Sequence, residues 1–193
     1  LLIQCPHSLD LLCWLFGQPQ TVTGFCNEGK YHKIEVEDEA TVYMEWKNGM
    51  TGVFIASTGE NPGINRMEIS FDKAIVTCTP SHITITENPE SSDVYKNMSQ
   101  KEYKTPVPKI TEKKFDLPVP DTYLDVFDSF SKAISTGSPL VATGKEAMMS
   151  LYISNAAYLS SAQKKTIALY DIGSDEELKF EEEFEKWLAS KSH

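Results

Sequence analysis

A series of strand-like segments around one tight turn constrains the fold of this chain more than any other feature. Apolar and polar residues alternate along residues 40–46, which is the period of a strand with two unlike faces. Asn48-Gly49 follows, and both residues tolerate the positive φ angles of hairpin turns. The return strand is expected at residues 51–57, so these two strands should pair antiparallel.

Further segments have strand-like composition, at residues 20–25, 66–71, 74–79 and 82–87. Their connections are short, and a parallel crossover needs a dozen or more residues. The sequence therefore predicts an antiparallel meander of at least five strands, to which residues 166–169 could add. Residues 88–114 show no sustained period and contain three prolines, so we expect a long excursion there, with short edge strands.

Helical periodicity or capping signals mark four segments: residues 5–16, 123–136, 144–161 and a final helix that starts after Ser174. Thr143 with Glu146, and Ser174 with Glu177, have the spacing of a capping box. A helix, a strand meander and then helices are typical of the α+β class. The expected fold is one domain over residues 1–193, in which helices pack on one face of a large, mostly antiparallel sheet.

Composition excludes several classes of protein. The net charge of −10 argues against binding of nucleic acid through its phosphates. The longest apolar stretch, residues 9–16, is far shorter than the ~20 residues of a membrane-spanning helix. No signal-peptide pattern opens the chain, and its apolar start suggests that another segment precedes it.

Cysteine and histidine usage predicts a cytoplasmic protein without a metal site. The four cysteines contain no CxxC pair and are expected to be reduced thiols. His32 and His82 are not spaced like zinc ligands. The acidic stretch at residues 176–185 is interpreted as a solvated helix face.

The first helix should have two unlike sides. At about 100° per residue, its apolar side contains Leu9, Leu12, Cys13 and Phe16, and Leu11 and Leu15 are expected to widen this side. His7, Asp10 and Trp14 fall on the opposite side. The helix dipole favours a neutral imidazole in the first turn, and such a ring can take a proton from an alcohol. On these residues alone, however, an ordinary surface or capping histidine is the more common explanation.

Several segments resemble, in the same order, the Gfo/Idh/MocA oxidoreductase family, which includes glucose-fructose oxidoreductase and inositol dehydrogenase. The first is residues 4–17, QCPHSLDLLCWLFG. Others are IEVEDEAT at 34–41, Asn48-Gly49, and STGENPGINRMEI at 57–69. A weaker match is NAAYLSS at 155–161. The resemblance implies a C-terminal domain that follows a dinucleotide-binding domain, which is absent from this chain.

The resemblance also implies roles for particular residues. His7 matches the active-site histidine of the family, and Asp10 matches an acidic position that faces the substrate. Asn65 and Arg66 lie on a loop expected to reach the substrate pocket, although a surface charge explains Arg66 equally well. Tyr158 is expected to pack in the core.

Two departures from the family pattern affect the expected activity. Ile3 stands where the family has Asp or Asn, and an apolar side chain cannot bind a hydroxyl. The chain also contains neither G-x-G-x-x-G nor Glu-Lys-Pro, the motifs of the preceding domain. We therefore expect that this chain alone neither binds NAD or NADP tightly nor turns over substrate.

Two functions follow as expectations. The first is the substrate-binding half of an NAD(P)-dependent oxidoreductase that acts on a hydroxyl of a sugar, inositol or related polyol. The alternative is a non-catalytic carbohydrate-binding or oligomerisation scaffold, which Ile3 favours. A homo-oligomer through the open sheet face is compatible with both. Apolar residues that could form this face are Val42, Met44, Trp46, Val53 and Ile55.

Overall fold

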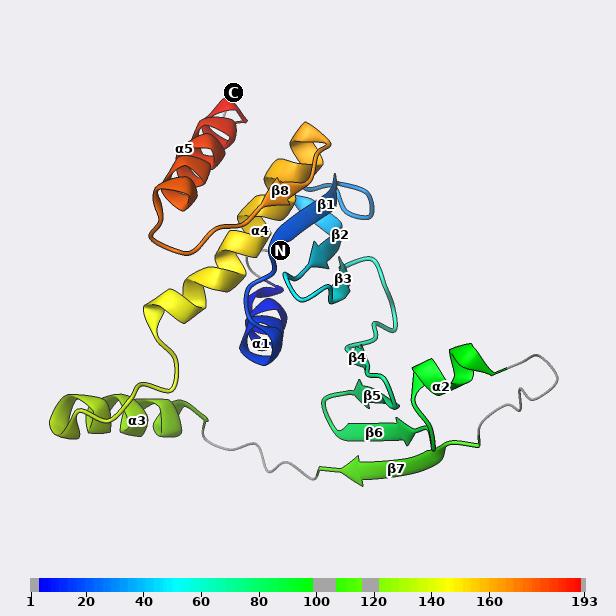
Figure 1. Ribbon diagram of the computed structural model, residues 1–193. Coiled ribbons are helices and arrows are strands. Elements are labelled where there is room, and N and C mark those ends of the chain that lie inside the picture. Colours follow the sequence, from blue (N-terminus) through cyan, green and yellow to red (C-terminus); the bar gives the residue numbers. More distant parts are fainter. Residues whose placement is uncertain (1–3, 99–106, 116–121, 192–193) are drawn as a thin grey trace. The chain divides into compact units, whose positions relative to one another are not determined.

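The computed structural model describes residues 4–98, 107–115 and 122–191, and shows an α+β fold of helices and two antiparallel sheets (Figure 1). The expected fold class is confirmed. The chain divides into two compact units, Leu1–Asn61 with Ser129–His193, and Pro62–Asp128.

The first unit is built on a four-stranded sheet. Its elements are α1 (Pro6–Phe16), β1 (Thr21–Glu28), β2 (Glu37–Glu45), β3 (Thr51–Ser57), α4 (Gly144–Gln163), β8 (Ile167–Ala168) and α5 (Asp175–Ser190). The strand order is β3-β2-β1-β8, with every neighbouring pair antiparallel. The expected return of the chain to this sheet near residue 167 is confirmed.

The β2–β3 hairpin has the predicted position but a longer turn than a two-residue one. Trp46 N–H donates to Met50 O, and Gly49 N–H donates to Trp46 O, both at 2.9 Å. Gly49 has a φ of 85°, whereas Asn48 is not among the residues with positive φ. This is the pattern of a three-residue loop that ends in a left-handed residue, which glycine adopts without strain.

Helix α4 packs directly on β1 because Gly24 has no side chain. A Cβ at Gly24 would lie 2.3 Å from the Ala157 carbonyl oxygen. Ser160 Oγ accepts a hydrogen bond from Gly24 N–H, and Ser161 Oγ accepts one from Cys26 N–H, both at 2.9 Å. Because β8 pairs only with the first two residues of β1, these two hydroxyls satisfy the edge of β1 beyond that pairing.

The core of the first unit lies between the sheet and helices α1, α4 and α5. Leu9, Val22, Val42, Met44, Ile153 and Leu159 are all fully buried in it. The burial of β2 residues shows that part of the expected partner face was wrong. Val42, Met44 and Trp46, which were expected to supply apolar side chains to a partner face, point to the helices instead and are at most 7% exposed.

The opposite face of this sheet is open to solvent. Val53 and Ile55 are 59% and 64% exposed, as their assignment to a partner face requires. Phe25 and Tyr43 are also exposed, and the register sets Tyr43 opposite Val53. Directly paired residues of antiparallel strands share a face, so these four side chains form one apolar surface, here called the open-face patch.

The second unit contains a separate sheet, in the order β4-β5-β6-β7. Its elements are β4 (Met67–Ser70), β5 (Ala74–Cys78), β6 (His82–Glu87), α2 (Ser92–Asn97) and β7 (Lys109–Lys114). The strands fall where they were expected, but one continuous meander was not correct. Gly59, Pro62 and Gly63 interrupt strand pairing after β3, so the next strands start a new sheet.

The positions of α1, α4, α5 and α3 (Thr122–Thr136) agree closely with the sequence, and α3 spans the boundary between the units. Helix α2 was not predicted, because it lies in the stretch expected to contain only short edge strands. Thr143 and Glu146 form the predicted capping box of α4. Ser174 caps α5 by accepting a hydrogen bond from Glu177 N–H. The Glu177 carboxylate, however, accepts from Gly173 N–H, one residue earlier than a capping box requires.

Candidate functional site

Helix α1 starts and stops where local sequence dictates. Pro6 occupies the first turn, where a missing N–H costs nothing and the fixed φ suits a helix. Gly17 ends the helix with a φ of 73°, and its N–H donates to Cys13 O at 2.7 Å. His7 and Asp10 are thereby held in the first one and a half turns of a regular helix.

The inner side of α1 is fixed in the core. Leu9 and Cys13 are buried, and Phe16 packs edge-on against Trp46 with ring centroids 6.3 Å apart. Trp46 Nε1 donates to Gly17 O at 2.9 Å, which joins the end of α1 to the sheet. The expected apolar side of the helix is therefore the side that anchors it, except that Leu11 and Leu15, which were expected to widen it, are exposed.

The outer side of α1 carries the candidate chemistry. His7 and Asp10 are exposed, and Trp14 is 79% exposed. Residues 7, 10 and 14 lie within about 60° of one another around the helix axis. The imidazole, the carboxylate and the indole therefore share one solvent-facing surface. Their roles in catalysis remain predictions.

The other candidate residues are placed as follows. Asn65 and Arg66 are exposed in the segment before β4, in the second unit, whereas His7 and Asp10 belong to the first. Ile3 lies outside the residues that the structure describes. Tyr158 packs against the core, and its ring stacks on Trp187 at 6.2 Å.

A buried carboxylate that sequence reasoning missed organises the loop between β1 and β2. Asp38 is 2% exposed and accepts hydrogen bonds from the backbone N–H groups of Lys30, Tyr31 and His32 at 2.6–2.9 Å. Burial alone would raise the pKa of Asp38, but these bonds outweigh it and hold the pKa at about 2. Asp38 stands among acidic neighbours in the sequence, so no local pattern distinguishes it from surface charge. Its role is structural, because all these contacts are within the loop.

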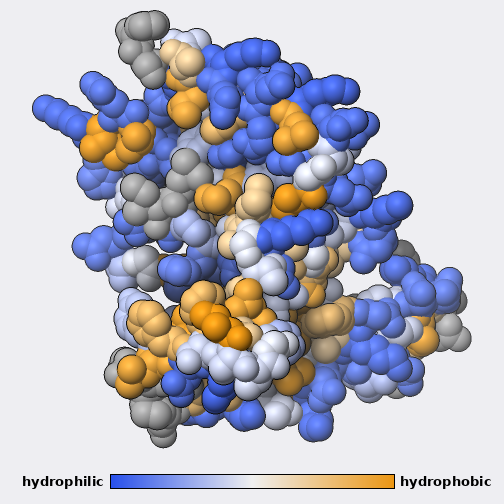
Figure 2. Space-filling model, turned by 90° about the vertical axis from the view of Figure 1, so that its left-hand side faces the viewer, coloured by the Kyte–Doolittle hydropathy of each residue, from blue (hydrophilic) through white to orange (hydrophobic). Residues whose placement is uncertain are grey.

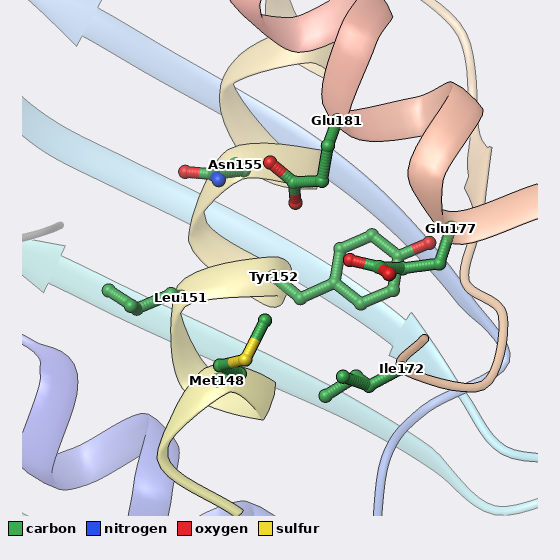
Figure 3. A pocket seen from close by; sticks show the side chains of 7 residues that line it. All are labelled: Met148, Leu151, Tyr152, Asn155, Ile172, Glu177 and Glu181. Atoms are coloured by element: carbon green, nitrogen blue, oxygen red, sulfur yellow. The ribbon is translucent and has the colours of Figure 1, made fainter. Parts of the chain in front are cut away.

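A cavity of about 120 Å³ lies between α4, α5 and the segment that joins β8 to α5 (Figure 3). Its lining residues are Met148, Leu151, Tyr152, Asn155, Ile172, Glu177 and Glu181. Glu177 is only 3% exposed, so the interpretation of residues 176–185 as a solvated face is wrong at this position. Burial, and then the charge of Glu177, raises the pKa of Glu181. The capping-box spacing was the one sequence signal that Glu177 turns inward.

Two of the cysteines, Cys13 and Cys26, are poor nucleophiles. All four are free thiols. Burial raises the pKa of Cys13 and of Cys26 to about 11, so both stay protonated near neutral pH. Within the described ranges, no cluster of three or more His, Cys, Asp or Glu side chains could hold a metal ion. Across the same ranges, the helices are all too short or too polar to span a bilayer.

Among the residues that the structure describes, the first turns of the helices do not suit a dinucleotide pyrophosphate. A dinucleotide pyrophosphate binds the free N–H groups of a helix N-terminus after a glycine-rich turn. The first turns of α2, α3, α4 and α5 contain the acidic residues Asp93, Asp125, Glu146 and Asp175–Glu177, respectively. Such carboxylates repel phosphate, and Glu146 also accepts a hydrogen bond from Thr143 N–H. Helix α1 begins with Pro6, which has no N–H.

Several solved structures share this fold and are longer than this chain. One is the WlbA dehydrogenase of Bordetella pertussis in complex with NADH and UDP-GlcNAcA, at 20% identity and a TM-score of 0.55 over 86% of this chain and 44% of that one. Another is an oxidoreductase of Agrobacterium radiobacter in complex with NAD+, L-tartaric acid and magnesium. It is 18% identical, with a TM-score of 0.63 over 86% of this chain and 47% of that one. A third is the UDP-N-acetylglucosamine 3-dehydrogenase GnnA of Acidithiobacillus ferrooxidans. It is 18% identical, with a TM-score of 0.60 over 80% of this chain and 45% of that one. This chain thus spans less than half the length of each.

The comparison of sequences gives the family. A search of curated proteins found no significant match. The profile of the oxidoreductase family, C-terminal alpha/beta domain, matches residues 1–169, which include α1, both sheets and α4. The chain belongs to the Gfo/Idh/MocA oxidoreductase family and is a C-terminal domain of that family.

Proposed function

We propose that this domain is the substrate-binding half of an NAD(P)-dependent oxidoreductase that acts on a hydroxyl of a sugar, inositol or related polyol. The observation that carries the proposal is the outer side of α1, where His7 and Asp10 are exposed together on a helix whose inner side is anchored in the core. Family membership and the complex of the Bordetella pertussis WlbA dehydrogenase with UDP-GlcNAcA support the substrate class.

Oxidation of an alcohol removes a proton from its oxygen and a hydride from its carbon. His7 is proposed to take the proton, because an imidazole can accept one near neutral pH. Asp10 lies one turn further along the helix, where its carboxylate would orient the imidazole or accept a hydrogen bond from a second substrate hydroxyl. Asn65 and Arg66 are proposed as further substrate contacts.

NAD or NADP is proposed as the cofactor, bound by a separate dinucleotide-binding domain. The acidic first turns described above and the lack of a glycine-rich turn support this division of labour. Isolated from such a domain, the chain should be inactive. A cytoplasmic location stays a prediction, with which the four free thiols agree.

The open-face patch favours one further property, a homo-oligomer. Phe25, Val53 and Ile55 are each about 60% exposed on the same face of a sheet that helices cover only from the other side. Such a flat apolar face can bury itself against a second copy of the same face across a twofold axis. Sedimentation of Val53→Lys should then show smaller assemblies than the wild-type chain.

The oxidoreductase proposal is tested with the protein in which this domain is joined to its dinucleotide-binding domain. Sugars, inositols and nucleotide sugars are each supplied with NAD or NADP, and formation of the reduced nicotinamide is followed. We expect turnover with at least one polyol, and a loss of about 100-fold or more in His7→Ala. Ser8→Ala, one residue along the same helix, is the control and should retain turnover. Binding of a carbohydrate without any turnover would favour the non-catalytic scaffold instead.

A further inference from the structure

Next to the candidate catalytic side chains, α1 carries three exposed apolar residues. Leu11, Trp14 and Leu15 are 46%, 79% and 43% exposed, and together they are called the α1 strip. Exposed apolar side chains occur elsewhere on the surface too (Figure 2). The α1 strip differs because it continues the line of His7: residues 7 and 14 are two helical turns apart, or about 10 Å along the axis.

The α1 strip is not needed to hold the helix in place. Leu9, Cys13 and Phe16 already anchor α1 through its other side. An indole that is four-fifths exposed contributes little to the stability of its own domain. Tryptophan is, however, enriched among the residues that dominate protein interfaces, because its large ring loses little conformational entropy on burial.

The shape of the α1 strip indicates a protein partner. Small-molecule sites are concave, whereas the outer side of a surface helix is convex. The solved relatives extend beyond this fold by more than half of their own length, and the WlbA and Agrobacterium structures contain NADH and NAD+. Because His7 can act only beside a nicotinamide, the part of the protein that supplies the nicotinamide must lie against this side of α1.

We propose that Leu11, Trp14 and Leu15 form the surface on which the dinucleotide-binding domain docks, and that Trp14 is its central contact. Burial of the indole fixes the angle at which that domain meets α1, and thereby the position of the nicotinamide relative to His7. Trp14 is in this sense a positioning residue, which acts through the other domain. The inference depends on the proposed oxidoreductase function.

The test uses the two-domain protein with Trp14→Glu, which places a charge at the centre of the α1 strip. NAD(H) affinity should stay within about twofold of wild type, because the dinucleotide site itself is untouched. Turnover should fall by about 10- to 100-fold, as expected when reacting groups are misplaced. Limited proteolysis should cleave the connection between the domains faster, and Trp14→Phe should restore most of the turnover and the resistance.

Two controls separate the possible failures. Leu178→Glu puts the same charge on α5, at an exposed apolar site outside α1 and the open-face patch, and should leave turnover and interdomain proteolysis unchanged. Circular dichroism of the isolated Trp14→Glu chain should match wild type, since the indole is exposed there.

Unchanged turnover and proteolysis in Trp14→Glu would overturn the docking proposal. An increased KM for bulky substrates alone, with unchanged kcat and proteolysis, would assign Trp14 to substrate binding and overturn it as well. If His7→Ala is fully active, the proposed function fails instead.

Discussion

Substitution of Gly24 by alanine should destabilise the first unit strongly, because α4 lies against the backbone of β1 at this position. The new Cβ would be 2.3 Å from the oxygen and 2.7 Å from the Cα of Ala157. Ordinary carbon–oxygen and carbon–carbon contacts need more than 3 Å, so α4 must move away by about 1 Å. That shift also stretches the 2.9 Å bond from Gly24 N–H to Ser160 Oγ. Overpacking costs about 1–3 kcal/mol, and a weakened buried hydrogen bond adds about 1 kcal/mol.

Urea unfolding followed by tryptophan fluorescence measures this loss, since all three tryptophans, Trp14, Trp46 and Trp187, belong to the first unit. The midpoint for Gly24→Ala should drop by the equivalent of about 2–4 kcal/mol. Gly144→Ala is the matched control, because no atom lies within 4 Å of its added Cβ at the start of α4. The control should be neutral or more stable by up to about 1 kcal/mol. Equal midpoints for the two variants would refute the close approach of α4 to β1.

Three further outcomes are expected. Because the pKa of Glu181 is raised, the folded chain takes up a proton before the unfolded chain does as pH falls from neutral, and the α4–α5 contact should gain stability down to the pKa of an ordinary glutamate. In urea unfolding at different pH values, Glu181→Gln should remove this gain, whereas Glu182→Gln, which is exposed on the same helix, should retain it. The lowered pKa of Asp38 acts in the opposite sense, so its contribution to the stability of the fold is present above about pH 3.8 and is lost as pH falls toward 2. At neutral pH, Asp38→Asn should speed amide hydrogen exchange at Lys30, Tyr31 and His32, whereas Glu35→Gln should not. Calorimetric titration of the isolated chain with NAD or NADP should show no micromolar binding, and a clear micromolar isotherm would place a dinucleotide site within this domain.

Local patterns in the sequence were sufficient to predict most of the helices and strands, and to predict which residues lie on the outer side of α1. The alternation in residues 40–46 and the Asn-Gly turn identify the β2–β3 hairpin, because each depends only on neighbours in the chain. Helical periodicity separates Leu9 and Cys13 from His7 and Asp10, and the structure has the first pair buried and the second exposed. The role of His7 came only from resemblance, because one histidine at a helix start carries no specific pattern.

Burial and sheet pairing depend on residues that are far apart in the chain, so local sequence patterns could not predict them. Alternation shows that β2 has an apolar face but not what covers it, so Val42 and Met44 were assigned to a partner chain when α4 and α1 cover them. The division into two sheets depends on which strand edges meet, which residue composition does not encode. Asp38 was missed because its burial depends on three amides of a folded loop, and an acidic residue between Glu37 and Glu39 gives no sign of that.

We propose that the outer side of α1 supplies the proton-transfer group of a hydride-transfer reaction. Single-turnover measurement of nicotinamide reduction in the two-domain protein tests this role, because it separates the chemical step from product release. With saturating substrate and cofactor, we expect His7→Ala to slow this step by about 100-fold or more and Ser8→Ala to leave it unchanged. A His7→Ala rate equal to that of wild type would contradict the claim and remove α1 from the chemistry.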